Sequence, residues 1–301
     1  MASPVVLGTW PTPLESAPRL AATLGLTELW IKRDDLSGLG AGGNKVRKLQ
    51  YSCAEALAAG ATTLVTTGAA QSNHARLTAA AAARLGLRAV LVLAGGPAPA
   101  ERGNLLLDAL AGAEIVWAGR TPLDQCAEAT AAELRGWGAR PYVIPFGGSS
   151  ISSVQGYVDC AREIEQQLGE FDRIVVAVGS GGTMAGLVAA LGPERVIGVD
   201  AGAVADPART VAALVNGRPD ARVEPADLRI DRRQIGPGYG AFTERVREAL
   251  KLAARTEGLF LDPTYTGRAL ASLIAGSVPP HGRTVFLHSG GLPGLFGHPH
   301  L

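Results

Sequence analysis

The feature that most constrains the fold is a regular alternation of short apolar strands with amphipathic helices. Between residues 49 and 144 the sequence predicts four such cycles, and the first two helices end at Gly60 and Gly86. Further along, residues 174–178 (Ile-Val-Val-Ala-Val) are apolar on both faces, as in the central strand of a parallel sheet. Because repeated β–α units form parallel sheets covered by helices, the chain is predicted to be an α/β protein.

A turn-rich segment at residues 145–150 divides this alternation into two parts. The chain of 301 residues is long enough for two domains. The simplest partition is a small domain of residues 49–152 and a large domain built from residues 1–48 and 153–301. Segment 203–238 yields no clear prediction, because charges and prolines interrupt its periodicity.

Composition argues against several classes of function. Hydrophobic residues make up 47% and charged residues 18%, the balance of a compact soluble protein. The net charge is +1 and no basic stripe is interleaved with aromatics, so the sequence lacks the electrostatic signature of nucleic-acid binding. We recognise neither a secretory signal nor an uninterrupted apolar stretch of about 18 residues. We therefore expect neither a nucleic acid nor a membrane as a partner.

The cysteines and histidines do not predict a metal site. Cys53, Cys126 and Cys160 lie far apart, as expected of small buried residues in a reducing compartment, and we expect a cytoplasmic protein. His298 and His300 lack a third nearby ligand, so we expect no metal.

Residues 42–45, with the sequence Gly-Gly-Asn-Lys, place a lysine in a glycine-rich bend between a short strand and a helical pattern. A lysine amine becomes a nucleophile toward aldehydes when its surroundings lower its pKa and fix its geometry. Taken alone, this stretch is better explained by a solvated loop lysine. The other glycine- and hydroxyl-rich turns of the chain favour the catalytic interpretation.

A second turn lies between a predicted central strand and a helix, and it reads Gly179, Ser180, Gly181, Gly182, Thr183. Successive backbone N–H groups and the helix dipole make such a turn an anion site. Met184 stands where a dinucleotide-binding fingerprint needs glycine, and no lysine follows as in a P-loop. A single phosphate is the better fit, and a tight crossover without a ligand is the alternative.

Four more turns carry polar side chains at expected strand or loop ends. Gln71, Ser72, Asn73 and His74 follow a strand, where open α/β sheets place ligands, and Ser72 or Asn73 could also cap the next helix. Tyr239 and Tyr265 lie on stiff turns rich in glycine and proline, and Ser289 follows the last strand.

Together these turns resemble the D-cysteine desulfhydrase and 1-aminocyclopropane-1-carboxylate (ACC) deaminase family. The motifs that carry the resemblance are residues 32–35, 42–45 with 47–49, 71–74, 179–183, 237–240, 262–267 and 288–291. The similarity runs from Pro11 to the C-terminus. These are pyridoxal-phosphate enzymes of the tryptophan synthase β type (fold type II). The resemblance implies two domains, each with an open, mostly parallel twisted sheet flanked by helices, and an active site in the cleft between them.

The resemblance also implies roles for individual residues. Lys45 would carry the cofactor as an internal aldimine, with Asn44 beside it. Asn73 would hydrogen-bond the ring hydroxyl, and residues 179–183 would hold the phosphate. The ring nitrogen would face a hydroxyl, with Thr266 the first candidate and Ser289 the second.

The expected catalytic residues are Lys45, Ser72, Tyr239 and Tyr265. Ser72 and its neighbours Gln71, Asn73 and His74 would receive the substrate carboxylate or assist proton transfer, and the tyrosines would flank the substrate.

The expected reaction is β-elimination on a small β-substituted amino acid, with D-cysteine giving pyruvate, sulfide and ammonia. ACC deaminases of this family carry a glutamate after the tyrosine and typically a leucine after the late histidine, whereas this chain has Thr266 and Ser289. A hydroxyl at the ring nitrogen favours elimination of a β-leaving group. The alternatives are ACC deamination, a lyase for L-cysteate, β-chloroalanine or serine, and a pyridoxal-phosphate-binding protein without turnover. An NAD-binding enzyme is a more distant alternative. The resemblance suggests a homodimer.

Two departures from the family concern the width of the pocket. Segment 94–103 looks shorter than the corresponding loop, and the N-terminus looks slightly truncated. Both are expected to widen the pocket and to change which leaving group it accepts.

Overall fold

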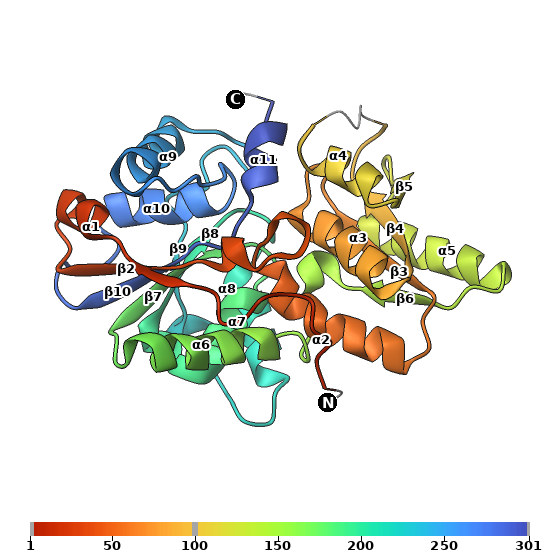
Figure 1. Cartoon of the computed structure of the whole chain (residues 1–301), viewed down its shortest axis with the longest axis horizontal. Coiled ribbons are helices and arrows are strands. Elements are labelled where there is room, and N and C mark those ends of the chain that lie inside the picture. The colour runs from red at the N-terminus through yellow and green to blue at the C-terminus, as the bar shows by residue number, and fades with distance from the viewer. Residues whose placement is uncertain (1–2, 98–101, 300–301) are drawn as a thin grey trace.

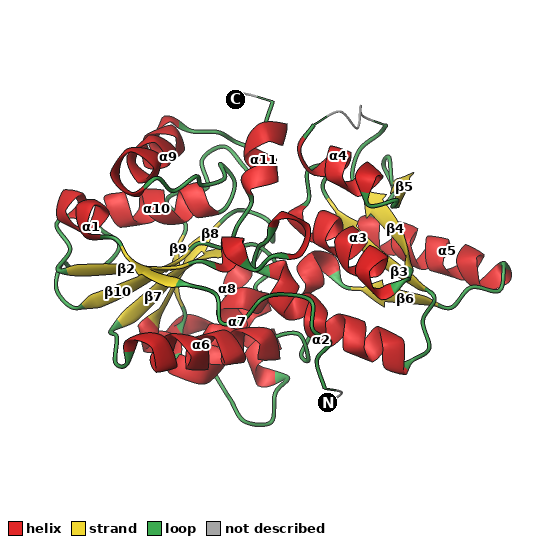
Figure 2. Ribbon diagram, viewed as in Figure 1, coloured by secondary structure: helices red, strands yellow, loops and turns green. Residues whose placement is uncertain are grey.

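The computed structural model describes residues 3–97 and 102–299, and they fold around two separate β-sheets (Figures 1 and 2). The larger sheet has the strand order β1-β2-β10-β7-β8-β9 and the smaller one the order β5-β4-β3-β6. Only β1 pairs antiparallel with its neighbour. The strands of the larger sheet are β1 (Leu14–Ser16), β2 (Glu28–Lys32), β7 (Arg173–Val178), β8 (Val196–Asp200), β9 (Arg229–Asp231) and β10 (Arg283–Leu287). Those of the smaller sheet are β3 (Thr63–Gly68), β4 (Arg88–Leu93), β5 (Glu114–Trp117) and β6 (Pro141–Ile144).

Helices cover both faces of each sheet (Figure 2). The larger sheet packs on one face against α6 (Gln155–Leu168), α7 (Gly182–Leu191) and α8 (Pro207–Asn216), and on the other against α1 (Pro18–Leu24), α9 (Glu244–Glu257) and α10 (Thr266–Ile274). The smaller sheet packs against α2 (Lys45–Ala58), α3 (Asn73–Leu85) and α4 (Gly103–Leu110) on one face and α5 (Leu123–Gly136) on the other. The remaining elements are α11 (Leu292–Gly297) and the 3₁₀ turns η1 (Asp34–Leu36), η2 (Leu39–Ala41), η3 (Phe146–Gly148), η4 (Pro193–Arg195) and η5 (Pro225–Asp227).

The predicted fold class, an α/β protein with two mostly parallel sheets, is confirmed. The larger sheet takes strands from both ends of the chain, since β2 pairs with β10. We keep the domain boundaries at residues 49 and 152 as a proposal. Helix α2 spans the first of these boundaries and packs with the smaller sheet. No helix in the described part of the chain is long and apolar enough to cross a membrane.

Two local features differ from the sequence-based expectation. Lys45 is the first residue of a helix rather than part of the preceding bend, because the bend is completed by Gly42 and Gly43, both at positive φ. The uninterpreted segment 203–238 contains α8 and β9. Its Pro207 obscured the helix but occupies the first helical turn, where a proline is well tolerated.

A buried ion cluster joins α2 to the larger sheet. The guanidinium of Arg47 donates to both carboxylate oxygens of Asp34, at 2.8 and 2.9 Å, and to Glu163 on α6 at 2.7 Å. Glu163 also accepts from Lys32 at 2.7 Å, and the Tyr157 hydroxyl donates to Asp34 at 2.6 Å. Arg47 and Asp34 are almost completely excluded from solvent, so removing either partner leaves an uncompensated buried charge.

We therefore predict that Arg47→Met lowers the free energy of unfolding by about 3–5 kcal/mol, because Asp34 loses its buried partner. Chemical denaturation of the cofactor-free protein measures this. The matched control is Arg88→Met, which breaks an exposed ion pair with Glu114 and should change stability by less than about 1 kcal/mol. Equal effects of the two variants would contradict the role assigned to the cluster.

Candidate active site

The candidate site lies where the carboxyl ends of strands from both sheets meet, the usual ligand position in open α/β sheets. Two adjoining cavities occupy this place. The first is narrow and polar, and the second has a volume of about 250 Å³. Both are lined by Lys45, Asn73, Gly179, Ser180 and Tyr265.

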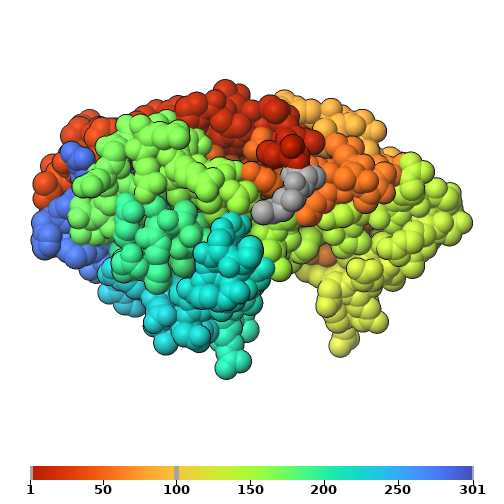
Figure 3. Space-filling model, turned by 90° about the horizontal axis from the view of Figure 1, so that it is seen from below, coloured from red at the N-terminus to blue at the C-terminus, as the bar shows by residue number. Residues whose placement is uncertain are grey.

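The second cavity opens toward the outside of the molecule. Leu123 and Ala203, from parts of the chain far apart in sequence, both line it. Figure 3 shows the molecule hollowed between its yellow-green and cyan-green parts, which contain these two residues. Of segment 94–103, predicted to widen the pocket, Ala94 lines this cavity, and residues 98–101 lie outside the described residues.

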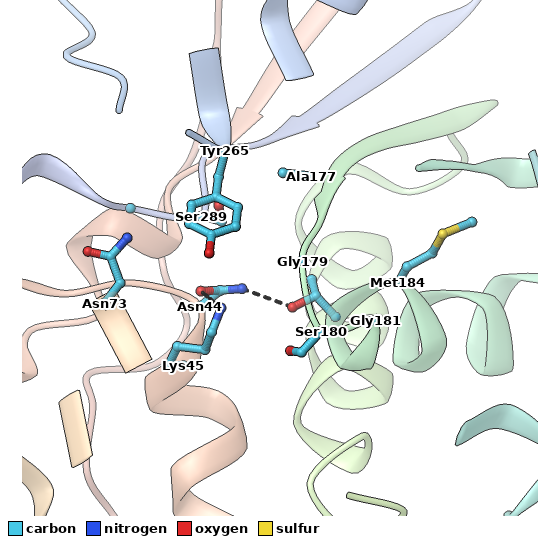
Figure 4. Close-up of a pocket in the computed structure, with 12 residues that line it drawn as sticks. Asn44, Lys45, Asn73, Ala177, Gly179, Ser180, Gly181, Met184, Tyr265 and Ser289 are labelled. Atoms are coloured by element: carbon cyan, nitrogen blue, oxygen red, sulfur yellow. Dashed lines mark hydrogen bonds between the residues drawn. The ribbon is translucent and has the colours of Figure 1, made fainter. Parts of the chain in front are cut away.

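Lys45 presents its amine to both cavities (Figure 4). The amine lies 3.0 Å from Oδ1 of Asn44 and 5.8 Å from the centre of the Tyr265 ring. Burial lowers the pKa of Lys45 to about 8; nearby Asp262 opposes this shift and Arg76 adds to it. The neutral, nucleophilic fraction of this amine near neutral pH is therefore much larger than for an ordinary lysine.

The bend before Lys45 requires glycine for a steric reason. A Cβ atom on Gly42, which has φ of +68°, would lie 1.8 Å from the carbonyl oxygen of Asp35. The bend is also tied to the end of β10, because the N–H of Asn44 donates to the carbonyl of Ser289 at 3.0 Å. The backbone thus fixes where α2 begins and where the Lys45 side chain enters the cavity.

The predicted anion site has the expected backbone form. Gly181 adopts φ of +84° and α7 begins at Gly182. Gly179, Ser180, Gly181 and Thr183 line the first cavity, whereas Gly182 lines neither cavity and its N–H donates to the Ser149 hydroxyl. The amide of Asn44 donates to the Thr183 hydroxyl at 2.9 Å, the dashed line in Figure 4. This bond connects the lysine-bearing helix α2 to the anion turn.

Sequence reasoning missed a buried cation next to this turn. Lys48 is almost completely buried; its amine donates to the carbonyl of Gly147 and to the hydroxyl of Ser149 at 3.0 Å. That hydroxyl lies 2.8 Å from the Ser180 hydroxyl and accepts from the N–H of Gly182 at 3.2 Å. Within the described residues Lys48 pairs with no carboxylate, and burial holds its pKa well below the ordinary value; an anion bound nearby would favour its charged form. The available signal was its spacing, since Lys48 lies one helical turn after Lys45.

The polar turn after β3 divides into residues that face the cavity and residues that support it. Ser72 lines the second cavity and also caps α3 by accepting from the N–H of Ala75 at 3.1 Å, so both predicted roles of Ser72 are compatible. Gln71 lines neither cavity: its side chain contacts Arg102 and Asn104 at the start of α4. Its assignment as a substrate ligand is therefore withdrawn.

His74 is nearly buried, and its ring bonds to Thr66. The Thr66 hydroxyl donates to the carbonyl of Ile144, so it accepts from Nε2 of His74 at 2.9 Å. This assigns the proton to Nε2. Burial and the nearby Lys48 and Lys45 hold the pKa of His74 well below its ordinary value, so the ring stays neutral. His74 lines the second cavity with its Nε2 engaged, and its Nδ1, which has no hydrogen-bond partner within the described residues, is left as an acceptor.

Tyr239 and Tyr265 form one side of the second cavity as a pair. Their hydroxyl oxygens lie 2.6 Å apart and their rings are T-shaped, with centroids 6.1 Å apart. Buried Arg268 fixes the Tyr239 turn by donating to the carbonyls of Gly238 and Tyr239, both at 2.8 Å. The two tyrosines, 26 residues apart in sequence, therefore present two mutually hydrogen-bonded hydroxyls to the cavity.

The structure reverses the order of the two candidates for the ring nitrogen. Thr266 lines neither cavity; its fully buried hydroxyl donates to Asp262 at 2.7 Å and accepts from the N–H of Asp262 at 2.8 Å, at the start of α10. Ser289 does line the first cavity, and its hydroxyl makes no hydrogen bond within the described residues. Because the Thr266 hydroxyl is already engaged at a helix start, we propose Ser289 in place of Thr266 as the partner of the ring nitrogen.

These residues fit a phosphorylated pyridine aldehyde. The glycine turn with Lys48 close to it suits a phosphate, the Lys45 amine suits an aldehyde, and Asn73 and Ser289 offer hydrogen bonds to ring substituents. Within the described residues, no group of three or more His, Cys, Asp or Glu side chains is placed to hold a metal.

Comparisons with known proteins agree with this fit. Residues 5–290 match the family model described as "Pyridoxal-phosphate dependent enzyme". The chain is 45% identical to D-cysteine desulfhydrase of Klebsiella pneumoniae (strain 342) and 44% identical to that of Salmonella schwarzengrund (strain CVM19633), covering 97% of this chain and 95% of each relative. A solved ACC deaminase homologue superposes with a TM-score of 0.86 at 37% identity, covering 99% of this chain and 94% of the other.

A more distant structure shares only the fold. This is a pyridoxal 5'-phosphate-dependent aspartate racemase with a TM-score of 0.69 and 16% identity, covering 93% of this chain and 90% of the other. The family match and the desulfhydrase relatives identify pyridoxal phosphate as the cofactor of this chain.

We predict that the cofactor-free protein takes up pyridoxal phosphate faster as pH rises through about 8 and at a constant rate above it, because only the neutral Lys45 amine attacks the aldehyde. An unperturbed lysine would continue to gain reactivity up to about pH 10.4. Stopped-flow absorbance in the visible measures the rate. A midpoint near the unperturbed value would show that the cavity does not lower the pKa of Lys45.

We predict that removing the two candidate hydroxyls for the ring nitrogen affects different quantities, cofactor affinity for Ser289 and stability for Thr266. Ser289→Ala should weaken pyridoxal phosphate binding about 3–10-fold and leave the stability of the cofactor-free protein nearly unchanged, because it removes one hydrogen bond to the ligand. Thr266→Val should lower the unfolding free energy of the cofactor-free protein by about 1–3 kcal/mol, because Asp262 loses its partner. Absorbance titration and denaturation measure the two quantities, and the reverse pattern would restore Thr266.

Proposed function

We propose a lyase function for this chain, which belongs to the family of pyridoxal-phosphate-dependent enzymes. The reaction is β-elimination from D-cysteine, in which the amino acid and one water molecule give pyruvate, hydrogen sulfide and ammonia. The main support is the Lys45 amine at the junction of a phosphate-type cavity and a substrate-sized cavity. The desulfhydrase relatives, at 45 and 44% identity over nearly the whole chain, support the choice of substrate.

Different residues of the chain accept the proton and bind the carboxylate of the substrate in this reaction. When bound, pyridoxal phosphate withdraws electrons from the substrate carbon next to the amine, which makes the proton on that carbon acidic. Nζ of Lys45 then accepts this proton, and its lowered pKa of about 8 suits a base near neutral pH. Ser72, at the start of α3, offers its hydroxyl and the helix N-terminus to the substrate carboxylate.

The tyrosine pair is placed to assist the leaving group. Burial raises the pKa of both Tyr239 and Tyr265, so both hydroxyls stay protonated near neutral pH. They face the second cavity, where a β-substituent of the substrate would lie. We propose that one of these O–H groups donates to the departing sulfur.

The walls of the second cavity favour a thiol over a charged β-group. Its apolar lining includes Ala69, Leu123 and Phe146, and Lys45 is the one cation among the described residues that line it. A sulfonate, as in L-cysteate, would be desolvated there with no cation beside it except Lys45, which the proposed reaction uses as anchor and base. ACC deamination is disfavoured because this chain has Thr266 at the position where ACC deaminases of the family carry a glutamate.

Two further properties stay proposals. A cytoplasmic location is supported by the three free cysteines, Cys53, Cys126 and Cys160, since such residues are typical of a reducing compartment. A homodimer is suggested by the family resemblance alone. Size-exclusion chromatography with light scattering tests the dimer.

We predict that the purified holoenzyme releases a 2-oxo acid, pyruvate, from D-cysteine faster than it releases pyruvate from L-cysteine, L-cysteate, β-chloroalanine or serine, or 2-oxobutanoate from ACC. Lys45→Ala should lower turnover by at least about 10²–10⁴-fold and abolish the visible absorption band, because it removes both the anchor and the base. Lys251→Ala, at an exposed position on α9, is the matched control and should leave turnover and the absorption band unchanged.

The same panel distinguishes the alternatives. Release of 2-oxobutanoate from ACC as the main activity would identify a deaminase. A yellow protein that turns over none of these substrates would be a pyridoxal-phosphate-binding protein without catalysis.

A further inference from the structure

Asn104, on the first turn of α4, bonds to the predicted cofactor ligand Asn73 from outside the cavity. Its side-chain amide nitrogen donates to the backbone carbonyl of Gln71 at 2.8 Å and to Oδ1 of Asn73 at 3.0 Å. Asn104 is completely buried and lines neither cavity, so it would not touch a ligand itself.

The polarity of these bonds follows from the backbone. A carbonyl oxygen can only accept, so the group of Asn104 that faces Gln71 must be its NH₂. The same NH₂ lies against Asn73, which must therefore present its oxygen to Asn104. The amide nitrogen of Asn73 is left on the cavity side, as Figure 4 shows.

This orientation of Asn104 is held although its own oxygen has no hydrogen-bond partner within the described residues. Rotating the amide by half a turn would bring that oxygen against two acceptors, the Gln71 carbonyl and Oδ1 of Asn73. The orientation of both side-chain amides is therefore set by the Gln71 carbonyl and not by the hydrogen-bonding needs of the Asn104 oxygen.

The position of Asn104 is fixed by close packing. Its backbone N–H donates to Oε1 of Gln71 at 2.7 Å. A Cβ on the preceding Gly103 would lie 2.3 Å from that oxygen and 2.6 Å from Cα of Gly297 on α11. Helices α4 and α11 are neighbours in Figure 1, and Oε1 of Gln71 packs between Gly103 of one and Gly297 of the other.

We propose that Asn104 is a positioning residue that holds the Asn73 amide with its nitrogen toward the cofactor, as a donor to the ring hydroxyl oxygen. This rests on the proposed function of the site, because it assumes that the ring of pyridoxal phosphate lies beside Asn73. It also gives Gln71 a role: its carbonyl and its side-chain oxygen orient and hold Asn104.

The decisive variant reverses the polarity instead of removing the side chain. Asn104→Asp at alkaline pH places a carboxylate, which cannot donate, against Asn73, so the Asn73 amide turns and presents its oxygen to the ring oxygen. We expect cofactor affinity to fall about 10–100-fold, the usual range for supporting residues. Asn104→Ala leaves Asn73 free to turn either way, so a smaller loss of about 3–10-fold is expected. A purely structural Asn104 predicts that alanine, which loses every side-chain bond, is at least as harmful as aspartate.

The measurement is the dissociation constant of pyridoxal phosphate from the cofactor-free protein, obtained by absorbance titration, with thermal unfolding as a check of folding. Asn104→Asp is also made in an Asn73→Ala background, where it should change affinity less than about 2-fold because there is no amide to turn. The control is Asn216→Asp, at the exposed end of α8, where the side chain bonds only to the backbone of Val223. Affinity there should be unchanged.

The outcomes separate this inference from the proposed function. If the wild type binds the cofactor and Asn73→Ala weakens binding, an equal loss from Asn104→Asp in both backgrounds overturns the positioning role alone. If alanine at 104 weakens binding as much as aspartate, the positioning role also fails. A wild-type protein that takes up no pyridoxal phosphate overturns both the function and the inference.

Discussion

The arrangement of the site depends on one buried interaction, the contact of the Arg47 guanidinium with Asp34 and Glu163. It holds α2, which packs with the smaller sheet, against η1 and α6 of the larger one. Successive residues of a helix are rotated by about 100°, so Lys45 and Lys48 share a face and Arg47 points away from it. Anchoring Arg47 therefore aims Lys45 into the cavities and Lys48 at the support of the anion turn.

The three cations of this helix differ in what surrounds them, and that difference determines their chemistry. Both carboxylates of the buried cluster bond to Arg47, which stays charged and structural. Lys45 and Lys48 have no ion pair within the described residues, and burial lowers the pKa of both. Asp262 lies near Lys45, but its oxygens accept from the backbone N–H groups of the turn before α10. Both lysines are thus buried without a direct carboxylate partner, and Lys45, the one of the two that lines the cavities, is the amine predicted to react.

Much of this could be predicted from the sequence because it is encoded locally. Strand and helix periodicity predicted an α/β protein with parallel strands, and the family resemblance implied two sheets. The glycines at 42–43 and 181–182 marked backbone turns that close packing or positive φ requires. The failures concerned side-chain direction. Nothing local tells whether the Thr266 hydroxyl enters a cavity or stabilises a helix start, and Gln71 is withdrawn for the same reason. Lys48 bonds to Gly147, 99 residues away, and Asn104 bonds to Asn73, 31 residues away. Local sequence patterns do not reveal contacts between residues so far apart in the chain.

In this proposal, the type of reaction follows from how weakly the cofactor in this site stabilises negative charge on the substrate. A Ser289 hydroxyl at the ring nitrogen, unlike a carboxylate, does not enforce a protonated ring, so the cofactor stabilises a carbanion less strongly. A substrate then turns over efficiently only if a good leaving group departs as the proton is removed. A thiol assisted by the Tyr239–Tyr265 pair meets that condition, and the carbon leaving group of a cyclopropane does not. Removal of the proton next to the amine is also the first step of reversible proton exchange, and the weaker stabilisation of the carbanion limits that reaction. The site therefore favours elimination over the other reactions that begin with the same step.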